Sequence, residues 1–160
     1  MDYSSQFSSA AGTNGKVIAA RIHPNLDLLE TIENICKKHD IQYGQLTSTI
    51  GSLRKVSFNY VTTIEPAEGE GYTTAKSMEG PFSLLTGQGL VSPSDEPDKM
   101  NIHYHAVISG ENNVILGGHI LPGTITLTTT DLFIMEVKNI EMTRDRDPGT
   151  GAVVTTIHQA

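Results

Sequence analysis

Three of the six histidines in this 160-residue chain fall within residues 101–120. His103 and His105 alternate in the segment NIHYHAVIS, and His119 follows in the segment VILGGHI. In an extended strand, side chains two residues apart point to the same face and lie about 7 Å apart. His103 and His105 therefore share one face, and Tyr104 lies on the other with the apolar residues. Imidazole is a preferred ligand of zinc and similar ions, so the pattern predicts two ligands of a metal site.

The turn between the two histidine segments decides whether His119 can be the third ligand. A three-residue loop at 111–113 would pair Gly110 with Val114. His119 would then stand directly opposite His105, with Cβ atoms about 5 Å apart. A two-residue loop would instead send His119 to the opposite face of the sheet. The three-residue loop therefore predicts a site of three histidines, with zinc as the favoured ion.

The residues near this turn favour the longer loop. Asn112 and Asn113 tolerate the left-handed backbone conformation that three-residue loops require. Gly117 and Gly118, beside His119, carry no side chains, which leaves room for a ligand or for another backbone to come close. Histidines on a strand also serve as hydrogen-bonded surface or interface groups, and the spacing alone leaves that alternative open.

The elements that must position the histidines follow from the periodicity of the apolar residues. A helix is predicted at 23–40, because apolar residues recur at helical spacing and Asn25 is a good N-cap. Residues 62–80 are predicted to form a long loop. A mostly antiparallel sheet of about seven strands completes an α+β fold with one main N-terminal helix. The strands are predicted at 16–22, 41–53, 55–61, 81–91, 101–109, 114–120 and 123–137, followed by a hairpin of 139–146 and 152–158 around DPGTG.

The composition bounds the class of protein. With 38% hydrophobic and 18% charged residues, the chain is typical of one globular domain, which we place at 15–160 behind a flexible tail at 1–14. Its single cysteine, Cys36, excludes an internal disulfide and is expected to fill a core position in the helix. The N-terminus has no signal pattern, and no apolar run reaches the roughly 20 residues of a membrane span. A cytoplasmic protein is therefore predicted.

Several stretches together resemble one family, the PPC (plant and prokaryote conserved) domain, which plant AT-hook nuclear proteins carry behind their DNA-binding hook. The likeness covers most of residues 16–140, and its histidine-x-histidine and glycine-glycine-histidine hairpin is the most specific part. Two positions depart from the family pattern. Pro81 stands where many members have a glutamate, and Asp131 stands where the family has a glutamate in the threonine-rich strand. The matching pieces are Arg21 with the helical segment 23–41, TSTIGSL (47–53), SLLTGQG (83–89), the hairpin 103–124 and TTTDLFIMEV (128–137).

The resemblance implies an α+β domain that assembles as a homotrimer. It also implies that the three matching histidines form a metal site near the subunit boundary, and that the domain is associated with DNA-binding proteins. Direct DNA binding is not expected, because 11 basic against 18 acidic residues give a net charge of −7. The Arg-Gly-Arg-Pro core of an AT-hook is also missing. The segment nearest to it, 144–148, interleaves carboxylates and is interpreted as a charged strand that leads into a turn.

Two classes of function remain open. In the first, the three histidines hold a metal ion whose open coordination position binds a small molecule and could support its transformation. Arg21 and Asp131 are the candidate helpers, Arg21 as a carboxylate clamp and Asp131 as an orienting group for a histidine, while Tyr104 is better interpreted as a core residue. In the second, the chain is a DNA-associated regulatory module or a trimerising interaction module without catalysis. The sequence names no reaction.

Overall fold

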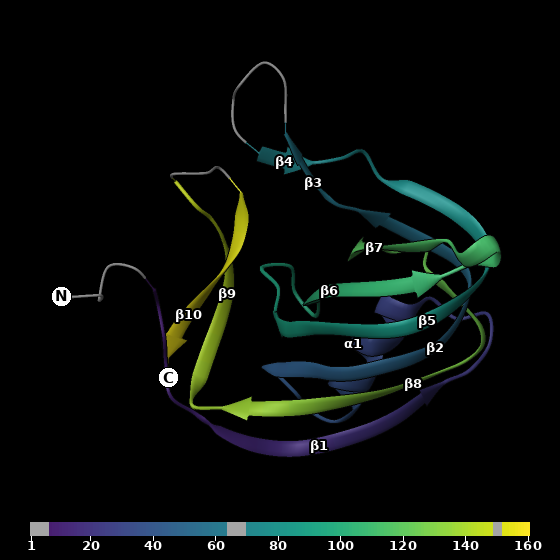
Figure 1. The fold of residues 1–160 in the computed structure, drawn as a ribbon. Helices are drawn as coiled ribbons and strands as arrows, with labels where there is room; N and C mark the ends of the chain where they lie inside the picture. The colour runs from purple at the N-terminus through teal and green to yellow at the C-terminus, as the bar shows by residue number, and fades with distance from the viewer. Residues whose placement is uncertain (1–6, 64–69, 149–151) are drawn as a thin grey trace.

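A curved six-stranded antiparallel sheet forms the body of the computed structural model, which describes residues 7–63, 70–148 and 152–160 (Figure 1). The strand order is β1-β8-β2-β5-β6-β7, and two further strand pairs, β3–β4 and β9–β10, lie outside this sheet. The strands are β1 Thr13–Ile22, β2 Gly44–Asn59, β3 Val61–Thr63, β4 Glu70–Tyr72, β5 Lys76–Pro93, β6 Met100–Ser109, β7 Ile115–Ile120, β8 Ile125–Lys138, β9 Ile140–Arg146 and β10 Val153–Gln159. The helices are α1 Leu28–Lys38 and a 3₁₀ turn, η1 Glu111–Asn113.

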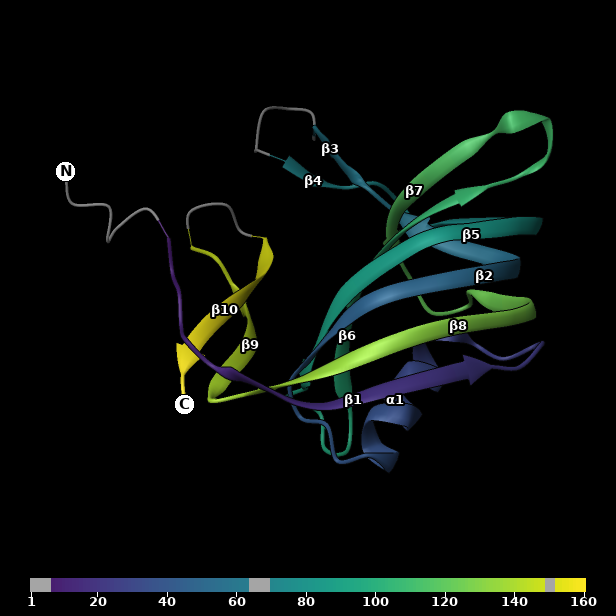
Figure 2. The same ribbon diagram turned by 60° about the horizontal axis from the view of Figure 1, so that its bottom comes forward.

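The sheet curls far enough for its last strand to return to a central one. Phe58 and Asn59, at the end of β2, pair with Ile120 and His119 of β7. Helix α1 contacts both β1 and β6 and lies on one face of the curl (Figure 2). Its apolar side, with Ile32 fully buried, packs into the core of the sheet. The α+β class with a mostly antiparallel sheet and one main helix is therefore confirmed.

The helix begins later than predicted. Asp27, not Asn25, is the N-cap: its Oδ1 accepts hydrogen bonds from the backbone N–H groups of Leu29 and Glu30, at 3.0 and 3.1 Å. Asn25 has a positive φ of 63° and belongs to the preceding turn. The backbone N–H of Asn25 donates to the carbonyl of Thr126 at 3.0 Å. Because this turn is tied to the start of β8, it cannot join the helix.

Two predicted boundaries in the first half of the chain are also wrong. The strands predicted at 41–53 and 55–61 form one long strand, β2, which passes through Gly51 with register shifts on either side. The predicted loop at 62–80 contains β3, β4 and the first residues of β5, while residues 64–69 lie outside the described part of the chain. Strand β2 is therefore long enough to reach β7 at its far end.

The ends of the chain match the prediction in part. The sheet begins at Thr13, which pairs with Lys138, so the last two residues of the predicted tail at 1–14 belong to β1; residues 1–6 are outside the described part. Strands β9 and β10 form the predicted hairpin, with Arg146 opposite Val153; residues 149–151 of its turn are not described. In the described ranges, no helix is long and apolar enough to cross a membrane.

The core contains the residues that the alternation of β6 predicts. Tyr104, Ala106 and Ile108 are buried, and this places His103 and His105 on the opposite face. Cys36 is a buried free thiol on α1, as expected of a core residue. Burial, together with the nearby charge of Glu33, raises its pKa from 9.0 to about 11.

Candidate metal centre

The turn between β6 and β7 has the length that the three-histidine prediction requires. The backbone N–H of Gly110 donates to the carbonyl of Val114 at 2.9 Å, and the three residues between them form η1. Asn113 has the left-handed conformation, with φ 59°. In the resulting register His105 stands directly opposite His119. The predicted register of this hairpin is therefore confirmed.

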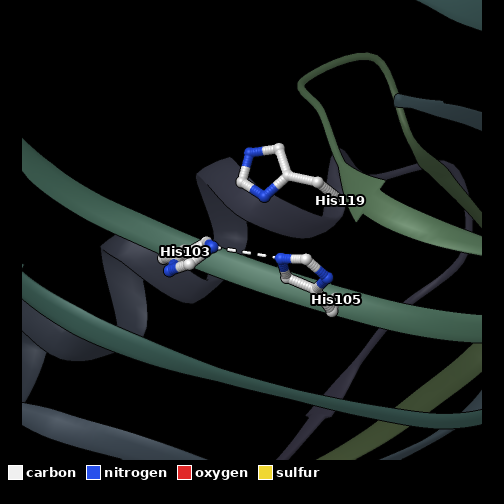
Figure 3. Close-up of side chains that lie close together, drawn as sticks. All are labelled: His103, His105 and His119. Atoms are coloured by element: carbon white, nitrogen blue, oxygen red, sulfur yellow. Dashed lines mark hydrogen bonds between the residues drawn. The ribbon is translucent and has the colours of Figure 1, made fainter. Parts of the chain in front are cut away.

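The three imidazole rings converge on a common point. One ligand nitrogen from each of His103, His105 and His119 lies within 4.8 Å of the other two, and the ring centroids are 5.0–5.2 Å apart. Figure 3 shows the rings facing one another across the gap between β6 and β7. The Nε2 atoms of His103 and His105 are 3.0 Å apart. The Nδ1 atom of His119 is buried and has no hydrogen-bond partner.

This arrangement fits a metal ion. Zinc–nitrogen bonds of about 2.0–2.1 Å in a tetrahedron separate two ligand nitrogens by roughly 3.3 Å. The 3.0 Å between Nε2 of His103 and Nε2 of His105 is close to that spacing. One shared proton could satisfy that contact, but it would leave the buried Nδ1 of His119 without a partner. An ion between the rings would satisfy all three nitrogens.

The electrostatics favour the neutral imidazoles that bind metals. Burial, followed by the positive charge of Arg144 and by the other two histidines, lowers the pKa of His103 to about 4. Burial lowers the pKa of His105 first and Arg144 adds to it. For His119, burial is followed by His105 and then Arg144. All three shifts favour the neutral imidazole near pH 7, the form whose lone pair binds a cation.

The two glycines beside His119 make room for backbone. A Cβ at Gly118 would lie 2.4 Å from the carbonyl oxygen of Asn59 on β2, and one at Gly117 would lie 2.8 Å from that of Ala106. Of the two alternatives in the sequence, the approach of another backbone therefore explains both glycines. Their absence of side chains allows β7 to pass closely between β6 and β2.

Comparison with known proteins identifies the family. Residues 9–138 match the sequence model of the Plants and Prokaryotes Conserved (PCC) domain. The chain belongs to this family. It is 24% identical, over 136 residues, to the bifunctional protein GlmU of Synechococcus sp. (strain JA-3-3Ab). The match covers 85% of the chain but 20% of the relative, so the chain spans about a fifth of the length of that protein.

Solved structures share the fold of this PCC domain. A metal-containing protein from Archaeoglobus fulgidus superposes with a TM-score of 0.77 at 22% identity, covering 92% of this chain and 98% of that one. A plant- and prokaryote-conserved (PPC) protein from Pyrococcus horikoshii gives 0.75 at 23% identity, covering 92% and 96%. A Bacteroides thetaiotaomicron protein, to which DNA binding is ascribed, gives 0.70 at 16% identity, covering 91% and 96%.

Arg144 is a charged side chain at the histidines that the sequence did not predict there. It lies on β9, beyond residue 138, where the match to the PCC domain ends. Its Nη1 donates to Nδ1 of His103 and to Oγ1 of Thr155, both at 3.1 Å, and its Nη2 donates to the carbonyl of Val153 at 3.2 Å. The sequence predicted a charged strand here, but no local pattern shows that the hairpin folds back against the histidines.

Two further residues border His119. Tyr72 of β4 lies beside it, with ring centroids 6.0 Å apart. Asn59 of β2 is its partner in the β2–β7 pairing, and the Oδ1 atom of Asn59 is buried without a hydrogen-bond partner. No local pattern pointed to either residue, because both reach His119 through contacts between segments far apart in the sequence.

The structure does not bring the predicted helpers Arg21 and Asp131 to the histidines of this chain. They form a two-pronged ion pair with each other, at 2.6 and 2.9 Å, on the exposed face of β1 and β8. Strands β2 and β5 stand between β8 and β6 in the sheet. Tyr104 is fully buried on the core face, as interpreted, and burial raises its pKa to about 12.

Proposed function

We propose that this PCC domain binds a divalent metal ion, zinc in the first place, through His103, His105 and His119. The observation that carries the proposal is the convergence of three neutral imidazoles, one of which, His119, has a buried Nδ1 without a hydrogen-bond partner. Within the described residues no carboxylate joins the group, and an all-imidazole set suits zinc better than magnesium or calcium. The metal-containing protein with the same fold supports the proposal.

We propose further that the bound ion presents an open position to a small molecule. Three protein ligands are the number found in catalytic zinc sites, where the fourth position holds water or substrate and the ion acts as a Lewis acid. A cavity of about 360 Å³ borders His119 on the side of helix α1, away from the face of β6 that carries His103 and His105. Its lining combines apolar side chains, such as Met100 and Ile102, with the charged side chains of Asp27, Glu30, Glu33 and Lys99. The proposal of an open position therefore depends on the number of protein ligands.

Metal analysis of the purified protein tests the first proposal. We expect close to one zinc ion per chain, lost in His105→Ala and retained in the control His23→Ala, which removes an exposed histidine. Zinc at a hundred times its dissociation constant should raise the melting temperature of wild type by about 5–11 °C. The proposal fails if wild type holds no metal, or if His105→Ala binds it as tightly.

We also propose that the chain assembles as a homotrimer. Four large apolar side chains, Val17, Ile50, Leu85 and Phe133, are 46–62% exposed on the face of the sheet away from the core. Each is next to a buried or half-buried residue in its strand, so their exposure follows from the alternation. Other copies of the chain would cover this face. Light scattering should give three times the mass of one chain, and the mass of a single chain would refute the proposal.

A DNA-associated module without catalysis is the second candidate, favoured by the structural neighbour to which DNA binding is ascribed. The net charge of −7 makes recruitment to a DNA-bound complex a better proposal than direct contact. Tight, sequence-selective binding of purified chain to DNA at moderate salt, in a gel shift, would favour direct contact instead.

A further inference from the structure

We propose that Arg144 makes the metal site selective for small anionic ligands, with a carboxylate in the first place, and that the N–H of Arg144 that points to His103 becomes free for such a ligand only when a metal is bound. This inference rests on the proposed metal site and names the class of ligand for its open position. It is carried by the contacts of the guanidinium and by the balance of charge around the three histidines.

The first observation is a positive charge without a counter-ion. No ion pair to Arg144 is found among the described residues, although the guanidinium is partly buried. Its three hydrogen bonds go to neutral acceptors: the ring of His103, the hydroxyl of Thr155 and the carbonyl of Val153. Arginine has no neutral form in proteins, so this charge is permanent.

The second observation is the absence of negative charge in the ligand set. The cluster contains only histidines, and all three sense the charge of Arg144. With a divalent ion bound, the ion, Arg144 and the neutral rings would together carry a formal charge of +3. Uncompensated charge in a partly buried site is costly, because the surroundings screen it less than water does. An anion at the open position would offset part of this charge.

The third observation concerns the ring of His103. Its Nδ1 accepts a hydrogen bond from Arg144, while its Nε2 faces Nε2 of His105 at 3.0 Å. A neutral imidazole carries a proton on one nitrogen and a lone pair on the other. When Nε2 donates its lone pair to a metal, Nδ1 must carry the proton and becomes a donor itself. The N–H of Arg144 Nη1 that pointed to this nitrogen then faces another donor and loses its acceptor. That N–H can then donate to a ligand.

These three observations indicate which anion fits. The released N–H of Arg144 is a charged donor, and a hydrogen bond from it to a negatively charged oxygen is stronger than one to a neutral acceptor. Arg144 keeps its bonds to Thr155, from Nη1, and to Val153, from Nη2, which hold the guanidinium beside the histidines while the other N–H of Nη1, which pointed to His103, is released. A carboxylate with one oxygen toward the metal position and one toward Arg144 would use both charges. A neutral amide of the same shape would lack the attraction to Arg144.

The test is titration calorimetry of the zinc-loaded chain with acetate, with acetamide as the neutral analogue of the same shape and with inorganic phosphate as a second anion. We expect acetate to bind the zinc-loaded protein and to bind the metal-free protein about tenfold or more weakly. Arg144→Gln should weaken acetate binding by about tenfold or more, the usual range for one charge-assisted hydrogen bond. Arg144→Lys, which keeps the charge without the fork, should lose less.

The matched control is Arg146→Gln, which removes the same charge from the same strand and should leave acetate affinity within about twofold. Zinc affinity, measured separately, should be unchanged or slightly tighter in Arg144→Gln, because a positive neighbour of the ion is removed. If phosphate binds more tightly than acetate and depends equally on Arg144, the carboxylate preference is wrong.

The outcomes separate the two proposals. If the wild-type chain binds zinc but does not distinguish acetate from acetamide, the role of Arg144 is refuted and the metal site stands. The same conclusion follows if Arg144→Gln binds acetate as wild type does. If the wild-type chain binds no metal, the proposed function itself fails, and the inference about Arg144 falls with it.

Discussion

Gly118→Ala is the substitution that most directly tests how the fold places His119. Gly118 lies where β7 passes the end of β2, and its ideal Cβ would be 2.4 Å from the carbonyl oxygen of Asn59 and 3.2 Å from the ring of Phe58. An ordinary Cβ contact begins near 3.4 Å, so β7 must retreat from β2 by about 1 Å. His119 is the next residue and must move with the strand.

The size of the effect follows from the tolerance of metal sites. The residues of a binding site must be held within about 0.5 Å of the geometry that binds the ligand, so a shift of about 1 Å at His119 exceeds that tolerance. We expect zinc affinity to fall by about tenfold or more, since outer-shell disturbances alone cost ten- to a hundredfold. Straining the β2–β7 pairing should also destabilise the fold by about 1–3 kcal/mol.

Zinc titration calorimetry and the melting temperature of the metal-free chain measure the two effects separately. Gly110→Ala is the matched control in the same hairpin, because its new Cβ would meet only the ring of Phe82, at 3.0 Å, which can give by a few tenths of an ångström. If Gly118→Ala keeps the zinc affinity and melting temperature of wild type, the close approach of β2 does not place His119, and the reasoning is wrong.

Two further predictions concern residues away from the histidines. Cys36, whose pKa is raised to about 11, should have about a hundredfold less thiolate near pH 8 than a free thiol of pKa 9.0, and should react with a disulfide reagent only on unfolding; fast labelling of the native chain would contradict its burial. Arg21→Gln should leave zinc affinity unchanged, because Arg21 pairs with Asp131. A tenfold loss would show instead that Arg21 reaches a metal site, for example that of a neighbouring copy.

The histidine hairpin was predictable because its information is local. Strand alternation fixes the face of His103 and His105, and the length of one turn fixes the face of His119. The turn contains Asn113 at the left-handed position that such loops need. Each of these rules acts over a few neighbouring residues, so the register could be derived before the structure was known.

The predictions that were wrong concern features that depend on contacts between segments far apart in the sequence. Asn25 and Asp27 are both good N-caps by type, and only the backbone bond of Asn25 to Thr126, about a hundred residues away, decides between them. Arg144 reaches His103 because a C-terminal hairpin folds back against β5, the neighbour of β6, which strand periodicity does not specify. Arg21 and Asp131 were expected at the histidines, but they lie on β1 and β8. Strands β2 and β5 separate β8 from β6, and no short sequence pattern specifies this strand order.

The location of the histidines within the curl explains why they can form a rigid site. His119 is the last residue of β7 that pairs with β6, and it also pairs with Asn59 of β2. Its backbone is therefore held from two strands at the point where the hairpin opens, and sites held by strands are more precise than sites on loops. The opening allows three rings to face one another without a side chain between them. The curl thus provides a fixed set of three nitrogens.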